Sequence, residues 1–152
     1  MTKYLPIYLN DHLAAAVGAV KLARRAAGQN EGTEYGEALA GLAGEIDQDR
    51  RTLQDLLKRL GIRNDPVKLL SSVVAEKLGR FKLNGELFRY SPLSRLEEIE
   101  ILMLGVEGKL ALWRALRANL DVQVDFDDLI RRGTAQRRRL EHLRLKAAAQ
   151  AF

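Results

Sequence analysis

Apolar residues recur along this chain at steps of three and four, the spacing that places side chains on one face of an α-helix. Four stretches share this period, and the first of them uses mostly small side chains. The four series are Leu5, Leu9, Ala16, Ala19 and Ala23; Leu39, Leu42, Ile46, Leu53, Leu56 and Leu60; Leu96, Ile99, Met103, Val106, Leu110 and Trp113; and Leu129, Gly133, Leu140, Leu143 and Ala147. Strong helix formers dominate the composition, so the pattern predicts an all-α protein with four long helices.

Capping residues indicate where the first two helices begin and end. The first is predicted over residues 4–27, with Gly28 closing it. Thr33 suits the N-cap of the second, because its hydroxyl can accept a hydrogen bond from a backbone N–H of the first turn. Gly61 suits the position after the last turn, which favours a left-handed backbone. The second helix is therefore predicted to run from Thr33 to Leu60.

The last two helices have similar signals. Ser91 and Pro92 open the third, with Ser94 and Glu97 at capping-box spacing, and it is predicted to run to residue 118. Asp125, with Asp128 three residues on, is predicted to cap the final helix, which continues to the C-terminus.

The segment between the second and third long helices is long enough to cross from one end of a bundle to the other. It is predicted to hold a short helix over residues 66–78, opened by Pro66 and ended by Gly79. Residues 80–90 form an irregular connection that is apolar for a loop, with Phe81, Leu83, Leu87, Phe88 and Tyr90. Such a loop would cover one end of the bundle or form a dimer contact. The predicted fold is one domain, residues 1–152, built as an antiparallel four-helix bundle with a helical crossover.

Polar residues interrupt three of the four apolar series. Steps of three and four lead to His12 in the first helix, Asp49 in the second and Gln136 in the last. Counting outward from the two turns places His12 level with Asp49, and Gln136 level with Glu107 and its neighbour Gly108. Each long helix therefore offers one polar residue near the middle of the predicted bundle.

This organisation resembles the ferritin-like superfamily, in which two helix hairpins are joined by a long crossover. The resemblance covers the whole chain and rests on architecture, with Glu45–Gly61 in the second helix and Gln136–Leu143 in the last as the matching stretches. It implies the fold. It also implies a di-iron site with a carboxylate from each of two helices and Glu-x-x-His from each of the others. No Glu-x-x-His occurs in this chain, where the corresponding pairs read Asp49–Thr52 and Gln136–Arg139. The chain therefore departs from the family at the residues that bind iron.

Three interpretations of the polar layer His12, Asp49, Glu107 and Gln136 stay open at this point. The residues could form a structural hydrogen-bonded network, because buried polar groups need partners. Some of them could instead lie on the flank of the bundle, in contact with water. A third alternative is a mononuclear metal site made by His12, Asp49 and Glu107.

Positive charge is concentrated in the last helix. Residues 131–146 contain seven basic side chains and one acidic side chain, a charge of +6, whereas the whole chain carries +5 and the remainder therefore −1. Arg137, Arg138, Arg139 and Arg144 are the candidates for contacts with an anion such as a nucleic-acid backbone. No interleaved aromatics or recognised nucleic-acid motif accompany them. Pairing with acids on a neighbouring helix is favoured instead, and Asp47, Asp55 and Glu97 are the acids considered.

Other candidate chemistry is sparse. The chain has no cysteine and two histidines, so it offers little for a nucleophile–base arrangement and no thiolate metal site. His142 is predicted to be exposed, Trp113 to pack in the core, and Gly105, Gly108 and Gly133 to allow close helix approach. Without a signal peptide or a long apolar run, a cytoplasmic protein with no membrane contact is expected.

The favoured function is a non-enzymatic structural or interaction module with no cofactor, acting as a homodimer. One alternative is a divergent metal-binding protein that uses the His/Asp/Glu set, and a further one is non-specific nucleic-acid binding through the basic last helix.

Overall fold

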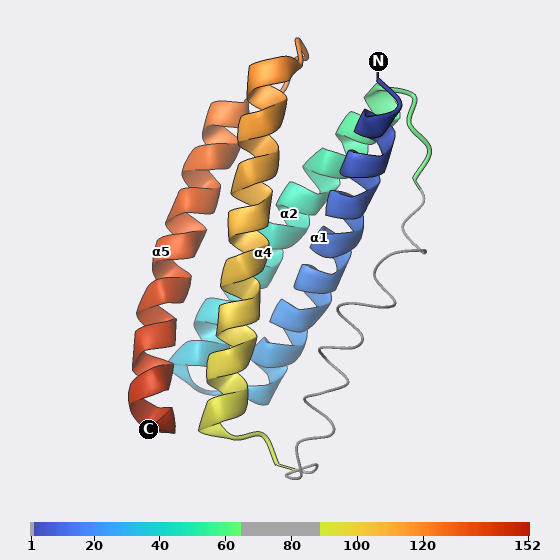
Figure 1. The fold of residues 1–152 in the computed structure, drawn as a ribbon. Helices are drawn as coiled ribbons and strands as arrows, with labels where there is room; N and C mark the ends of the chain where they lie inside the picture. The colour runs from blue at the N-terminus through green and yellow to red at the C-terminus, as the bar shows by residue number, and fades with distance from the viewer. Residues whose placement is uncertain (1, 65–88) are drawn as a thin grey trace. The chain divides into compact units, whose positions relative to one another are not determined.

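A computed structural model describes residues 2–64 and 89–152 of the chain, and the regular secondary structure of these residues is helical without any strand. They form α1 (Tyr4–Gln29), α2 (Glu34–Arg59), α4 (Pro92–Asn119) and α5 (Phe126–Ala151). The predicted all-α class and its four long helices are confirmed, with ends within two residues of the predicted ones (Figure 1). The predicted short helix over 66–78 and the apolar side chains Phe81, Leu83, Leu87 and Phe88 lie outside the described residues.

The helices pair as two antiparallel hairpins, α1 with α2 and α4 with α5 (Figure 1). Each hairpin belongs to its own compact unit, Met1–Ser91 and Pro92–Phe152. Short connections after Gln29 and after Asn119 reverse the chain, so the two helices of a hairpin lie side by side along their length. The packing within each hairpin is therefore the basic organisation of the protein.

The turn of the first hairpin is held by hydrogen bonds around Asn30 and Thr33. The Thr33 hydroxyl accepts from the backbone N–H of Gly36 at 3.2 Å, which confirms it as the N-cap of α2. The same hydroxyl donates to the backbone carbonyl of Asn30 at 2.7 Å, and the Asn30 side chain donates to the Ala26 carbonyl at 2.8 Å. The Tyr90 hydroxyl accepts from the Asn30 amide at 2.7 Å. These contacts fix the path of the chain from α1 into α2.

The C-terminus of α2 is closed as the sequence predicted. Gly61 has a φ of 69°, and its N–H donates to the Lys58 carbonyl at 3.0 Å while that of Ile62 donates to the Leu57 carbonyl at 2.9 Å. This is the Schellman arrangement, which satisfies carbonyls that would otherwise lack partners. The Asn10 amide then donates to the Arg63 carbonyl at 3.1 Å and ties the chain after α2 back to α1.

The second hairpin has a regular antiparallel register. Five cross-helix polar pairs of the described residues join α4 to α5, and in each pair the two residues are equally distant from Val122 along the chain to within one residue. They are Arg95 with Gln150, Glu100 with Arg144, Glu107 with Arg137, Lys109 with Gln136, and Arg117 with Asp127. The Asp125 carboxylate accepts from the N–H of Asp128 at 2.9 Å, which confirms the predicted cap of α5. The register counted from Val122 in the sequence is therefore confirmed.

A close helix approach in this hairpin depends on Gly133. A Cβ atom at Gly133 would lie 2.8 Å from Cδ2 of Leu110, a buried side chain of α4. The prediction of close approach is confirmed there. At Gly108 a Cβ atom would meet nothing within 4 Å, so close approach does not explain that glycine. Trp113 is buried, as predicted.

The start of α4 differs from the prediction in one respect. Pro92 is its first residue, so Ser94 lies inside the first turn and is not an N-cap. The capping-box spacing of Ser94 and Glu97 is therefore coincidental, since that motif requires the serine to precede the helix.

Gly36 allows the tightest contact in the first hairpin, and replacing it tests the turn. A Cβ atom at Gly36 would lie 2.2 Å from the backbone oxygen of Asn30. Hydrogen bonds fix the backbone on both sides of this contact, at Asn30 and at Gly36. Gly36→Ala is therefore expected to lower the free energy of unfolding by about 2 kcal/mol or more. Gly44→Ala is the matched control, because Gly44 is an exposed position of α2 with nothing within 4 Å. It is expected to stabilise by about 0.5–1 kcal/mol. Urea denaturation measures both, and equal effects would contradict this role of Gly36.

Candidate functional site

The predicted polar layer separates into buried and exposed members. Asp49 and Gln136 have exposed fractions of 1% and 0%, so these polar residues do occupy core positions of α2 and α5. His12 is half-buried in α1. The side chain of Glu107 is 47% exposed on α4. Glu107 therefore lies on the flank of its hairpin, as one alternative had it. The buried members of the layer are Asp49 and Gln136.

Gln136 is paired with a lysine across the second hairpin. The Lys109 ammonium donates a hydrogen bond to Oε1 of Gln136. Lys109 is half-buried and follows Gly108, the position that register counting placed opposite Gln136. An ammonium group thus lies beside the residue that occupies the ligand position implied by the ferritin-like resemblance. Because like charges repel, a metal ion at Gln136 would be unfavourable unless Lys109 moved or lost its proton.

Glu107 makes an ion pair with Arg137 of α5. Glu107 lies one residue before Gly108, the position opposite Gln136. One residue turns the helix by about 100°, so the Glu107 side chain points away from Gln136. The charged pair is about half exposed on both sides, so it stabilises the hairpin only weakly. Glu107 therefore does not belong to the interior of its hairpin.

His12 packs against an aromatic neighbour on its own helix. Its ring lies edge-on to Tyr8, with 4.6 Å between the ring centroids. Burial lowers the pKa of the imidazole, and the nearby Asp11 carboxylate opposes this shift without cancelling it. Burial thus favours the uncharged form of the ring, which suits its half-buried position and the aromatic contact.

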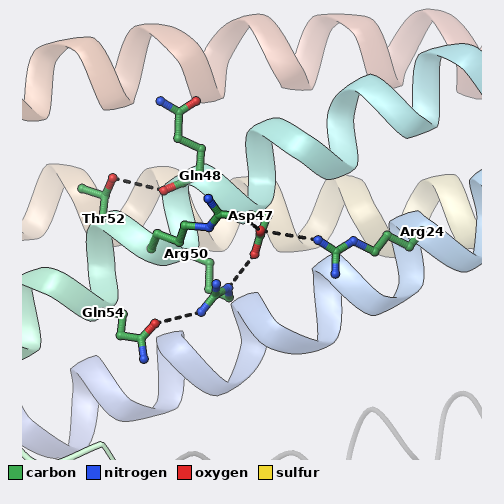
Figure 2. A network of polar contacts seen from close by, with 7 residues as sticks. Arg24, Asp47, Gln48, Arg50, Thr52 and Gln54 are labelled. Atoms are coloured by element: carbon green, nitrogen blue, oxygen red, sulfur yellow. Dashed lines mark hydrogen bonds and ion pairs between the residues drawn. The ribbon is translucent and has the colours of Figure 1, made fainter.

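A network of charged residues in the first hairpin surrounds Asp47. The sequence had suggested Asp47 only as an acid for the basic last helix. Arg50 Nε donates to Oδ1 at 2.7 Å, and Arg51 Nη2 donates to Oδ2 at 2.7 Å. Arg24 Nη2, from α1, lies 3.4 Å from the same Oδ2. Figure 2 shows Arg24 and Arg50 directed toward Asp47. We call these four residues the Asp47 cluster.

The Asp47 cluster joins the two helices of the hairpin through one nearly buried carboxylate. The side chain of Asp47 is 8% exposed, whereas those of Arg24 and Arg51 are 64% and 68% exposed. The hydrogen bond from Arg50, aided by Arg51, holds the pKa of the Asp47 carboxyl below its usual range against the opposing effect of burial. Arg50 is fixed further by a hydrogen bond to Gln54 at 3.0 Å (Figure 2). The spacing of Asp47, Arg50 and Arg51 along one helix was the sequence signal for this network.

Within its unit, the basic segment of α5 pairs with acids other than the three that the sequence suggested. Arg137 pairs with Glu107, and Arg144 lies 3.6 Å from Glu100 and donates to Glu141 at 2.7 and 2.9 Å. Arg131 and Arg132 pair with Asp128. Pairing with a neighbouring helix was the favoured prediction, and the acids of α4 that provide it are Glu100 and Glu107.

The three acids that the sequence suggested, Asp47, Asp55 and Glu97, have other surroundings. Asp47 binds the three arginines described above, and Asp55 pairs with Lys58 at 3.2 Å. Burial and the neighbouring Glu100 carboxylate raise the pKa of Glu97. Of the four candidate anion contacts, Arg137 and Arg144 have carboxylate partners. Arg137, Arg138 and Arg139 are all exposed. His142 is exposed, as predicted.

Metal ligands do not gather in the parts of the chain that the structure describes. Across residues 2–64 and 89–152, no group of three or more histidine, aspartate and glutamate side chains could hold a metal ion. His12 and Asp49 belong to the first hairpin and Glu107 to the surface of the second. The alternative metal site made of these three residues stays a prediction.

Comparisons with models of protein families, with characterised proteins and with solved structures found no match to this chain. None of the helices described is long and apolar enough to cross a membrane.

The Asp47 cluster predicts a pH-dependent stability. Asp47→Asn is expected to lower the free energy of unfolding by about 1–3 kcal/mol near pH 7, because Arg50 loses its charged acceptor while Arg24 and Arg51 can return to water. The pKa of Asp47 is lower in the folded protein than in the unfolded chain. Its contribution is thus complete above the unfolded pKa and is lost as the pH falls through the folded one, so the difference should shrink below about pH 4.

Thermal or urea denaturation between pH 3 and 7 measures this difference. Asp55→Asn is the control, since Asp55 is 61% exposed in its pair with Lys58 and its loss should cost less than about 0.5 kcal/mol. If both variants lose stability equally, or if the Asp47→Asn deficit does not change with pH, the Asp47 cluster does not stabilise the hairpin as described.

Proposed function

We propose that this chain is a non-enzymatic structural or interaction module of the cytoplasm, folded as a ferritin-like four-helix bundle without a di-iron centre and acting as a homodimer. The observation that carries the proposal is the hydrogen bond between Lys109 and Gln136. Gln136 occupies a fully buried position where the ferritin-like resemblance implies an iron ligand, and a side-chain ammonium lies against it. A protein group therefore supplies the cationic partner at that position.

A bundle of the two hairpins is supported by the width of the apolar surface on α4. Ile99, Val106 and Leu110 lie on the side of Gly133 and α5. Leu112 and Leu116 are buried as well, although steps of about 100° per residue place them on a different side of the helix. One neighbouring helix covers a stripe of only about 100°. The wider buried arc favours a second helical neighbour for α4.

The same register supports a structural role for the buried polar positions. His12 and Asp49 are at similar distances from the first turn, and Gln136 and Lys109 from the second. In an antiparallel bundle these groups would share one level. Buried polar groups that partner one another fix the register of helices, because any shift would leave them without hydrogen bonds. This role requires neither a substrate nor a bound ion.

Exposed apolar side chains support the homodimer. Leu93, Leu104 and Leu145 are 50%, 68% and 56% exposed on the second hairpin, and Tyr4 and Ile7 are 65% and 59% exposed on the first. Several large apolar side chains in contact with water are a feature of surfaces that bind other proteins. A second copy of the chain is the partner expected from the sequence.

Native mass spectrometry of protein purified without chelators tests oligomeric state and metal content together. We expect a mass twice that of the chain with no additional mass from iron, manganese or zinc. Stoichiometric metal would contradict the proposal, and its loss in His12→Ala would then favour the metalloprotein alternative. A metal-free monomer would contradict only the dimer and leave the interior as proposed.

A further inference from the structure

The Asp47 cluster contains more positive charge than its carboxylate can neutralise. Three guanidinium groups converge on two carboxylate oxygens, so the cluster carries a net charge of +2. Arg50 and Arg51 each donate a bond of 2.7 Å, one to each oxygen. Arg24 adds a third cation to an oxygen that already accepts from Arg51, at the longer distance of 3.4 Å. Pairing of Asp47 alone does not require this third arginine.

Most hydrogen-bond donors of the two outer arginines remain unengaged within the described residues. Each guanidinium has five N–H donors, and Arg24 and Arg51 each direct one nitrogen, Nη2, at Asp47. Their side chains are 64% and 68% exposed, in contrast to the 22% of Arg50. The carboxylate thus holds two exposed guanidinium groups, one from each helix, close to the same atom. Because Asp47 already restricts the two side chains, they would lose less conformational entropy on binding a ligand.

We propose that Arg24 and Arg51 bind a phosphate-bearing small anion on the solvent side of the Asp47 cluster. A phosphate dianion would neutralise the net charge of +2 and could accept from both guanidinium groups, whose planar donor pairs match phosphate oxygens. Asp47 acts as the positioning residue. Its negative charge is covered by Arg50 and lies at the base of the site, so the anion approaches the outer nitrogens. This site lies within one hairpin and does not depend on the proposed bundle or dimer.

Nuclear magnetic resonance titration of the full-length protein tests the proposal, with inorganic phosphate as the probe and sodium chloride of equal ionic strength as the reference. The Nε–H signals of Arg24 and Arg51 are expected to shift and to saturate at one phosphate per chain. Arg24→Gln and Arg51→Gln should each weaken binding by about tenfold, because each removes one charge-assisted contact. Both side chains are mostly exposed, so the variants should fold, and circular dichroism checks this.

Arg138→Gln is the matched control, since it removes the same charge from an exposed position of α5. It should change the affinity by less than about twofold, because an exposed charge outside the proposed site acts on the bound anion only through attraction that salt screens. A second titration with methyl phosphate separates the two sources of the ligand. Tighter binding of the monoester supports a site for an organic phosphate, and tighter binding of inorganic phosphate supports the free ion. Shifts that do not saturate, shifts that chloride reproduces, or equal losses in Arg138→Gln would overturn the proposal.

Discussion

Covering the apolar stripe of each helix is the constraint on which the rest of this structure depends. Within a hairpin, two helices cover each other along one side, and in the second hairpin Gly133 allows Leu110 to approach closely. On α4 the buried positions extend beyond that side, to Leu112 and Leu116. One neighbouring helix cannot cover both sides of α4, and the proposed bundle would supply the second contact that the hydrophobic effect favours. The turns and caps then determine which residues meet.

Two buried polar side chains satisfy a second constraint, since a buried donor or acceptor that loses its partner is costly. Gln136 accepts from Lys109 across the second hairpin, and Asp47 accepts from arginines of both helices in the first. These partners come from the chain itself. These pairings are compatible with the structural role proposed for the interior.

The helices were predictable because their signals are local. Thr33, Gly61 and Asp125 form their caps through hydrogen bonds within a few residues, so no knowledge of the tertiary structure was needed. The register of α4 against α5 was also predictable, because a short turn leaves antiparallel helices little freedom to slide. The counting from Val122 correctly placed Gln136 opposite the region of Gly108 and Lys109.

The ion pairs were less predictable because a charged side chain has several partners within reach. Asp47 could have paired with the basic last helix, yet Arg50 and Arg51 are one turn away on its own helix. Glu107 differs from a buried position by one residue, and helical periodicity alone does not resolve such a step at the edge of a stripe. For this reason the sequence grouped Glu107 with the polar layer, whereas its side chain lies on the flank of the hairpin.

Hydrogen exchange of a Leu53→Ala variant tests most directly whether the hairpins share one core. Leu53 is a buried residue of α2, and its truncation should cost about 2–5 kcal/mol. If the hairpins form one cooperative bundle, protection of the slowest amides should fall by the same factor in α1, α2, α4 and α5. Loss of protection confined to α1 and α2 would contradict the bundle and would show that each hairpin is stable on its own.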